Sequence, residues 1–193
     1  MRLLLIGPPG SGKGTQAIRL GAHLGVEHIS SGELLRKHAN EETGIGRTVK
    51  PLLDRGDLVP DGIVMDILRK PVETASRRGG YILDGFPRTV AQAEAAYLVA
   101  REIGAWVQVA LYLQVPRERL IERAMARGKA AGRTDDTLEV INHRLRVFDD
   151  LTMPLLDYYD NREILVTVDG DQSVDEVTAS AIARLDAVRA QLS

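Results

Sequence analysis

The sequence predicts a doubly wound α/β fold in which helices cover both faces of a five-stranded parallel sheet. Short apolar runs alternate with longer segments of helical period, which is the pattern of strands joined by crossover helices. The first apolar run ends at a glycine-rich turn that leads directly into a helical segment. The 193 residues can form one well-buried core with small inserted lobes. We therefore expect a single domain over residues 1–193.

Four of the expected strands are apolar runs, and the fifth is the short segment Glu27–Ser30. The apolar runs are Leu3–Ile6, Tyr81–Leu83, Val107–Leu113 and Ile164–Val168. The segments between the strands have apolar residues at helical spacing and predict helices. These helices are residues 13–24, 31–41, 44–55, 61–77, 89–102, 116–128, 137–160 and 174–190. Because such sheets bind ligands at the carboxyl ends of their strands, we expect the residues after the strands to share one cleft.

Two stretches interrupt the alternation of strands and helices. Residues 31–59 contain two successive helical segments without a strand between them. Residues 128–136 are rich in glycine and alanine and offer few side chains that could pack into a core. We interpret both stretches as mobile lobes whose order depends on a ligand.

Residues 7–16, with the sequence GPPGSGKGTQ, predict a phosphate-binding loop. A strand that ends at a glycine-rich turn before a helix directs backbone N–H groups and the positive helix N-terminus toward one point. Lys13 adds a charge for the outer phosphates, and Thr15 supplies the hydroxyl because Gly14 follows the lysine. A turn without chemical function is the alternative, but the strand, glycines, lysine and helix are all in register. The pattern favours a nucleotide site.

A second candidate site follows the buried run Tyr81–Leu83. Asp84 ends this run and Gly85 comes next, followed by Arg88 three residues later. In phosphate-loop enzymes, an aspartate at the end of a neighbouring strand holds Mg²⁺ directly or through water. Asp84 and Gly85 could instead form only a turn. Their place beside the phosphate loop favours the magnesium interpretation.

The composition excludes several classes of function. The net charge of −2 gives no general attraction to nucleic acid or to anionic membranes, and no apolar run approaches the roughly 20 residues of a membrane span. The sequence has no cysteine, and its four histidines lack the spacing of metal ligands, so we expect no structural zinc. The first strand begins after Met1 and Arg2 without a cleavable signal, and a cytoplasmic protein is expected.

Four motifs in combination resemble the adenylate kinases, which are nucleoside monophosphate kinases. The motifs are GPPGSGKGTQ at 7–16, HISSGELLR at 28–36, DGFPRT at 84–89 and GRTDD at 132–136. The resemblance extends from Met1 to about Val177. It implies a P-loop NTPase-type sheet with an inserted NMP-binding lobe at 30–59 and a short lid at 127–137, without the longer and sometimes zinc-bearing lid.

The activity that this resemblance implies is reversible phosphoryl transfer from Mg-ATP to AMP, which gives two ADP. The implied ATP contacts are Gly10, Ser11, Gly12, Lys13, Gly14, Thr15, Arg123, Arg127 and Gln172. The implied AMP contacts are Ser31, Arg36, Asp57, Leu58, Val59, Gly85, Arg88, Gln92, Arg133 and Arg144. The resemblance assigns catalysis to Lys13, Arg88, Arg127, Arg133 and Arg144, with Asp84 holding Mg²⁺ through water. Because both nucleotide sites lie in one chain, we expect a monomer.

Gln92 and Arg119 have alternative interpretations. Gln92 lies four residues after Arg88, where the family reads adenine, and its carboxamide matches the donor and acceptor of that base. However, Thr89 and Gln92 also have the spacing of a helix capping box. Arg119 matches no family position, and we interpret it as part of a solvated basic face.

Three other functions are considered. A UMP/CMP kinase of the same fold would usually have alanine in place of Ser31 and asparagine in place of Gln92. A nucleotide-binding switch of the GTPase type needs the guanine-reading pattern Asn-Lys-x-Asp, which the sequence lacks. A silent partner subunit would not need the second arginine set, which here is Arg88, Arg133 and Arg144. An AMP-specific kinase is the best-supported hypothesis.

Overall fold

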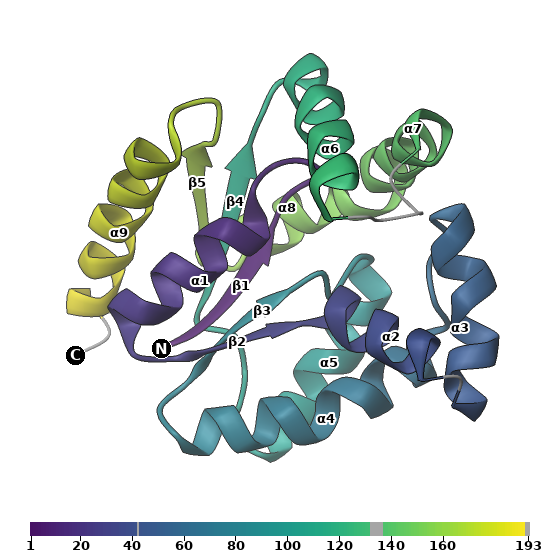
Figure 1. Cartoon of the computed structure of the whole chain (residues 1–193). Coiled ribbons are helices and arrows are strands. Elements are labelled where there is room, and N and C mark those ends of the chain that lie inside the picture. Colours follow the sequence, from purple (N-terminus) through teal and green to yellow (C-terminus); the bar gives the residue numbers. More distant parts are fainter. Residues whose placement is uncertain (42, 132–136, 192–193) are drawn as a thin grey trace.

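The computed structural model describes residues 1–41, 43–131 and 137–191. Its sheet contains five strands in the order β2-β3-β1-β4-β5, and every pair of neighbours is parallel (Figure 1). The strands are β1 (Arg2–Ile6), β2 (Glu27–Ser30), β3 (Tyr81–Asp84), β4 (Val109–Gln114) and β5 (Leu165–Asp169). The predicted fold class is confirmed, and the strands agree with the expected ones to within two residues at each end.

Helices connect and cover these strands. They are α1 (Lys13–Leu24), α2 (Ser31–Asn40), α3 (Gly44–Arg55), α4 (Asp61–Arg77), α5 (Val90–Glu102), α6 (Arg117–Ala131), α7 (Leu138–Val147), α8 (Pro154–Asp160) and α9 (Val174–Gln191). A π-helical turn, η1 (Phe148–Thr152), separates α7 from α8. The expectation of one helix over residues 137–160 was therefore wrong. Pro154 has no N–H group with which to continue an α-helical ladder, so the chain changes its hydrogen-bonding pattern before it.

Two hydrophobic cores lie on opposite faces of the sheet, because successive side chains of a strand point in opposite directions. On β1, Leu3 and Leu5 pack with apolar residues of α1 and α9. Leu4 and Ile6 pack with apolar residues of α4, α5 and α8 on the other face. Figure 1 shows α9 along one edge of the molecule, and α1, which contacts it, runs from there toward the middle. This three-layer arrangement leaves the carboxyl ends of the strands available for a site.

The helices α2 and α3 pack against each other beyond the end of β2 (Figure 1). Gly46 allows this close crossing, because a Cβ atom there would lie 2.0 Å from the carbonyl oxygen of His38. A second small layer beyond the sheet is formed by α6 and α7, which bury Leu120, Ile141 and Leu145 between them. Within the described residues, none of the helices combines the length and apolar character needed to cross a membrane.

Candidate active site

A cavity of about 750 Å³ lies at the carboxyl ends of the strands. It is bordered by the loop after β1, the end of β3, the start of α2, the helices α6 and α7, and the turn η1. The cavity therefore gathers residues that are far apart in the sequence, as the doubly wound fold predicts. The predicted ATP contacts all line it: Gly10, Ser11, Gly12, Lys13, Gly14, Thr15, Arg123, Arg127 and Gln172.

The phosphate loop needs glycine at specific positions. Gly10 has a φ of 86°, and a Cβ atom there would lie 2.3 Å from the carbonyl oxygen of Leu120. Gly12 has a φ of 90° and caps α1 without a side-chain hydrogen bond. The first turn of α1 has no acidic residue, so no carboxylate of that turn competes for its N–H groups and dipole. Such a helix end binds phosphate.

Lys13, the first residue of α1, lies at the centre of this loop. Its Nζ atom donates hydrogen bonds to the carbonyl oxygens of Gly7, at 2.6 Å, and Pro8, at 3.1 Å. Burial lowers the pKa of Lys13 to about 8, and the neighbouring arginines Arg88, Arg127 and Arg144 act in the same direction. An anionic phosphate group beside Lys13 would oppose this shift and keep the ammonium charged.

Asp84 lies beside the phosphate loop because β3 pairs with β1, with Asp84 opposite Leu5. Burial acts to raise the pKa of Asp84, but His28, Lys13 and Arg88 outweigh it and hold that pKa below its usual value. Asp84 is thus a buried, ionised carboxylate. Mg²⁺ is typically bound by one or two carboxylates together with waters and substrate phosphates, so one such residue fits the ion. Within the described residues, no group of three or more potential ligands forms an all-protein metal site.

Arg88 also lines the cavity and is held by hydrogen bonds at three points. Its Nε donates to the carbonyl oxygen of Gly85 at 2.9 Å, and its backbone N–H donates to Oε1 of Gln92 at 2.7 Å. Its own carbonyl oxygen accepts a hydrogen bond from the hydroxyl of Thr152 at 2.9 Å. Burial lowers the pKa of Arg88 to about 10, with Arg144 acting in the same direction, so the guanidinium remains charged at neutral pH.

Gln92 takes part in helix capping. Thr89 Oγ1 accepts from the Gln92 N–H at 3.1 Å, while Gln92 Oε1 accepts from the N–H of Arg88. The carboxamide nitrogen of Gln92 also donates to Asp61 at 2.6 Å, and the side chain is buried. The Thr89 half of the predicted capping box is present, whereas the Gln92 oxygen accepts from the N–H of Arg88, one residue before the cap residue. Both ends of the Gln92 carboxamide have protein partners in this structure. Adenine reading by Gln92 stays a prediction.

The other predicted AMP contacts differ in where they lie relative to the cavity. Arg36, Gly85, Arg88 and Arg144 line the cavity. Ser31 lies just behind the cavity wall: its hydroxyl is buried, has no hydrogen-bond partner in the part of the chain that the structure describes, and faces Gly85. The segment 57–59 does not line the cavity, whereas Gly56 does. Arg133 and residues 132–136 of the expected lid lie outside the described residues.

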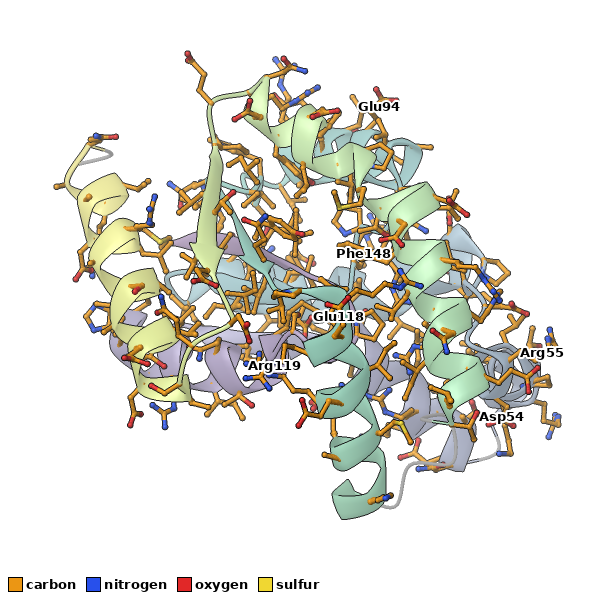
Figure 2. All side chains as sticks on the ribbon, turned by 90° about the horizontal axis from the view of Figure 1, so that it is seen from above. Asp54, Arg55, Glu94, Glu118, Arg119 and Phe148 are labelled. Atoms are coloured by element: carbon orange, nitrogen blue, oxygen red, sulfur yellow. The ribbon has the colours of Figure 1, made fainter. Side chains whose placement is uncertain are left out.

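On the ATP side, the loop after β5 is held against α6. Arg123 donates to the carbonyl oxygen of Gly170 at 2.8 Å and pairs with Asp171 at 3.3 Å. Arg119 also pairs with Asp171, at 3.3 Å, and with Glu122, at 3.2 Å, but it does not line the cavity. Figure 2 shows Arg119 and Glu118 at the start of α6. Arg119 is thus a surface residue, as its failure to match the family indicated.

Phe148 and Thr152 of η1 also line the cavity, and neither was predicted as a site residue. Both are buried, and Figure 2 shows Phe148 on the segment between α7 and α8. A signal for them existed in the sequence: Pro154 lies inside the helical pattern of residues 137–160, and a proline there interrupts a helix near the preceding residues. His143, whose Nε2 lies 2.9 Å from Asp57, was not predicted either.

Comparison with known proteins agrees with this geometry. The adenylate kinase family model matches residues 5–164. The adenylate kinase of Kocuria rhizophila is 42% identical over 185 residues, which are 96% of this chain and 98% of that protein. Those of Stenotrophomonas maltophilia and Thermus thermophilus are each 43% identical, over 97% and 95% of this chain and 100% and 96% of their own lengths. With a phosphate loop and a partly buried arginine lining one cavity, and with relatives of this similarity, the chain belongs to the adenylate kinase family.

Proposed function

We propose that this chain is an adenylate kinase, which transfers the terminal phosphoryl group of Mg-ATP to AMP and gives two ADP in a reversible reaction. The proposal rests mainly on one observation. Lys13 of the phosphate loop and Arg88 of the segment after β3 line the same cavity, and both are close enough to Asp84 to lower its pKa. A donor polyphosphate on the loop and an acceptor phosphate on Arg88 would therefore meet at Asp84.

The acceptor needs no general base, because a phosphate monoester with a second pKa of about 6 is already mostly dianionic at neutral pH. The chain's task is to align the two phosphates and to stabilise charge on the group in transfer. Lys13, Arg88, Arg127 and Arg144 line the cavity and supply positive charge there. Arg133, assigned from the family motif, would add a charge from the lid.

Asp84 is the residue that would hold Mg²⁺, through water, in complex with ATP. The ion supplies charge neutralisation between the phosphates when it is bound. Asp84 suits this task because it is ionised although it is buried. The chain offers no cysteine for a zinc-bearing lid. The proposed substrates are ATP, AMP and ADP, without a nucleic-acid or membrane partner, and the proposed functional unit is a monomer.

Water competes with AMP as the acceptor, so the cavity has to close before transfer. We assign this closure to an NMP-binding lobe at 30–59 and a short lid at 127–137. Support for the first assignment comes from α2 and α3, which pack on each other beyond the sheet and border the cavity through Arg36 and Gly56. Support for the second comes from α6 and α7, which carry Arg127 and Arg144 at the same cavity.

An assay of ADP formation from Mg-ATP with AMP, CMP, UMP and GMP in parallel, with a control that lacks an acceptor, tests the proposal. We expect turnover with AMP and with none of the other three monophosphates. The comparison with CMP and UMP is informative because Gln92 is already bonded to Arg88 and Asp61, which leaves adenine reading dependent on a rearrangement. Activity with CMP or UMP would indicate a pyrimidine kinase instead. ADP without an acceptor would indicate a hydrolase or a switch.

A further inference from the structure

The turn η1 is a local departure from α-helical geometry beside the site. The N–H of Met153 donates to the carbonyl oxygen of Phe148, five residues earlier, at 2.9 Å. Turns of this kind are rare and occur often at functional sites. Arg117 of α6 pairs with Asp149 at 2.8 Å and so connects η1 to α6. Thr152, the last residue of this turn, lines the cavity and is only 6% exposed.

The hydroxyl of Thr152 makes a long-range contact. A threonine inside an α-helix commonly bonds to the carbonyl one turn earlier in its own helix. Thr152 instead donates to the carbonyl oxygen of Arg88, which is 64 positions away in the sequence, at 2.9 Å. Gln92 accepts from the N–H of Arg88 at the same time. Side chains from two different elements thus fix both backbone polar groups of Arg88.

We propose that Thr152 is a positioning residue for phosphoryl transfer: its hydrogen bond to the backbone of Arg88 sets where the Arg88 guanidinium meets the acceptor phosphate. This inference rests on the proposed function, which places that phosphate at Arg88. The guanidinium is anchored to Gly85 through Nε, so a shift of the Arg88 backbone would move the remaining nitrogens relative to the phosphate. Small displacements of a charge-stabilising group reduce the rate strongly.

The test replaces Thr152 by valine, which has nearly the same shape but no hydroxyl, and by serine, which keeps the hydroxyl. With Thr152→Val, kcat/KM for AMP is expected to fall about ten- to a hundredfold. The KM for Mg-ATP should stay within about twofold, because the phosphate loop is untouched. Thr152→Ser should recover activity to within about threefold of the wild type. Thr167→Val, on the exposed side of β5, is the matched control, and we expect it to behave as the wild type.

A double-mutant cycle separates positioning from a general structural effect. If Thr152 acts through Arg88, then Thr152→Val should cause no further loss of kcat/KM in an Arg88→Met background. A merely structural role would cause the same loss in both backgrounds and would raise the KM for Mg-ATP as well. Circular dichroism checks folding, and Thr152→Ala, which also lacks the hydroxyl, replaces the valine variant if that variant does not fold.

Each result is decisive. Wild-type turnover in Thr152→Val, or an equal loss in the Arg88→Met background, would overturn the assignment of Thr152 while leaving the kinase proposal in place. A wild-type protein that forms no ADP from Mg-ATP and AMP would overturn both. Loss in valine, recovery in serine and no further effect without Arg88 would support the positioning role.

Discussion

At the scale of single residues, the site depends on positively charged side chains in a poorly solvated environment. Lys13 is only partly exposed and lies among three arginines, and these conditions disfavour its ammonium form. A site prepared for two polyphosphates concentrates positive charge, and Asp84 offsets only part of its effect on Lys13. Function and stability therefore oppose each other at Lys13, and the opposition is measurable as a dependence on pH.

Lys13→Met should change how stability depends on pH. In the wild type the pKa of Lys13 falls from an ordinary value of 10.5 to about 8 on folding. Between these values the unfolded chain binds a proton that the folded chain has lost, so the free energy of unfolding rises with pH. We expect the wild type to gain about 1 to 3 kcal/mol relative to Lys13→Met across this interval. Urea titrations at steps from about pH 7.5 to about pH 10.5 measure it, and a constant difference would contradict the expectation.

Gly10→Ala should destabilise the phosphate loop. A left-handed backbone conformation costs a non-glycine residue about 1 to 3 kcal/mol, and the new Cβ atom would also overlap the backbone of Leu120. We expect a loss of about 2 kcal/mol or more in the free energy of unfolding, measured with urea. The matched control is Gly62→Ala, because Gly62 is an exposed helical residue with open space around it. The control should raise stability by up to about 0.5 kcal/mol, and equal effects at both positions would refute the steric explanation.

At the scale of elements, the end of α3 is connected to α7. Asp57 accepts a hydrogen bond from Arg55 at 2.8 Å and lies 2.9 Å from Nε2 of His143. Arg55 and His143 hold the pKa of the Asp57 carboxyl below its usual value. Gly56 adds to the contact, because a Cβ atom there would lie 2.6 Å from the Arg144 side chain. The candidate NMP-binding lobe and the helix that carries Arg144 thus contact each other directly.

The pair of Asp57 and His143 should show measurable coupling. Both side chains are about one-third exposed, so we expect a coupling free energy of only about 0.5 kcal/mol in a cycle of Asp57→Ala and His143→Ala. The coupling should weaken in high salt, because the pair is near the surface. Lys50 and Asp54, which pair within α3, give a control cycle that does not connect two elements. Additive effects of Asp57→Ala and His143→Ala at low salt would show that the contact between the two elements does not contribute to stability.

The element scale also shows what a sequence can predict. The strands, the glycine-rich loop after β1 and the position of Asp84 at the end of β3 were predictable, because each belongs to a contiguous pattern of near neighbours. The contact between Thr152 and Arg88 was not, because residues 64 positions apart leave no joint signal in local periodicity. Pro154 indicates the break in the sequence, although the helical period of residues 137–160 favours one continuous helix. Gln92 could be assigned a capping role from its spacing with Thr89, whereas its bond to Asp61 required the fold.

At the scale of the whole molecule, one cavity borders the sheet, the lobe helices and the helices α6 and α7. A transfer that excludes water needs these parts to close over both nucleotides. We expect the radius of gyration in small-angle scattering to fall when an inhibitor that joins two adenosines through a phosphate chain is added. ATP analogues alone, which fill only the donor side, serve as the comparison. An unchanged radius with the two-headed inhibitor would contradict closure.

The central claim is that this cavity passes a phosphoryl group directly from one bound nucleotide to another. The most direct test supplies ATP labelled at the terminal phosphate, with Mg²⁺ and AMP, and follows the label. We predict that the label appears in the β-phosphate of ADP, that AMP is required, and that Lys13→Met loses the transfer while remaining folded. Label in inorganic phosphate, or transfer that persists in Lys13→Met, would contradict the claim.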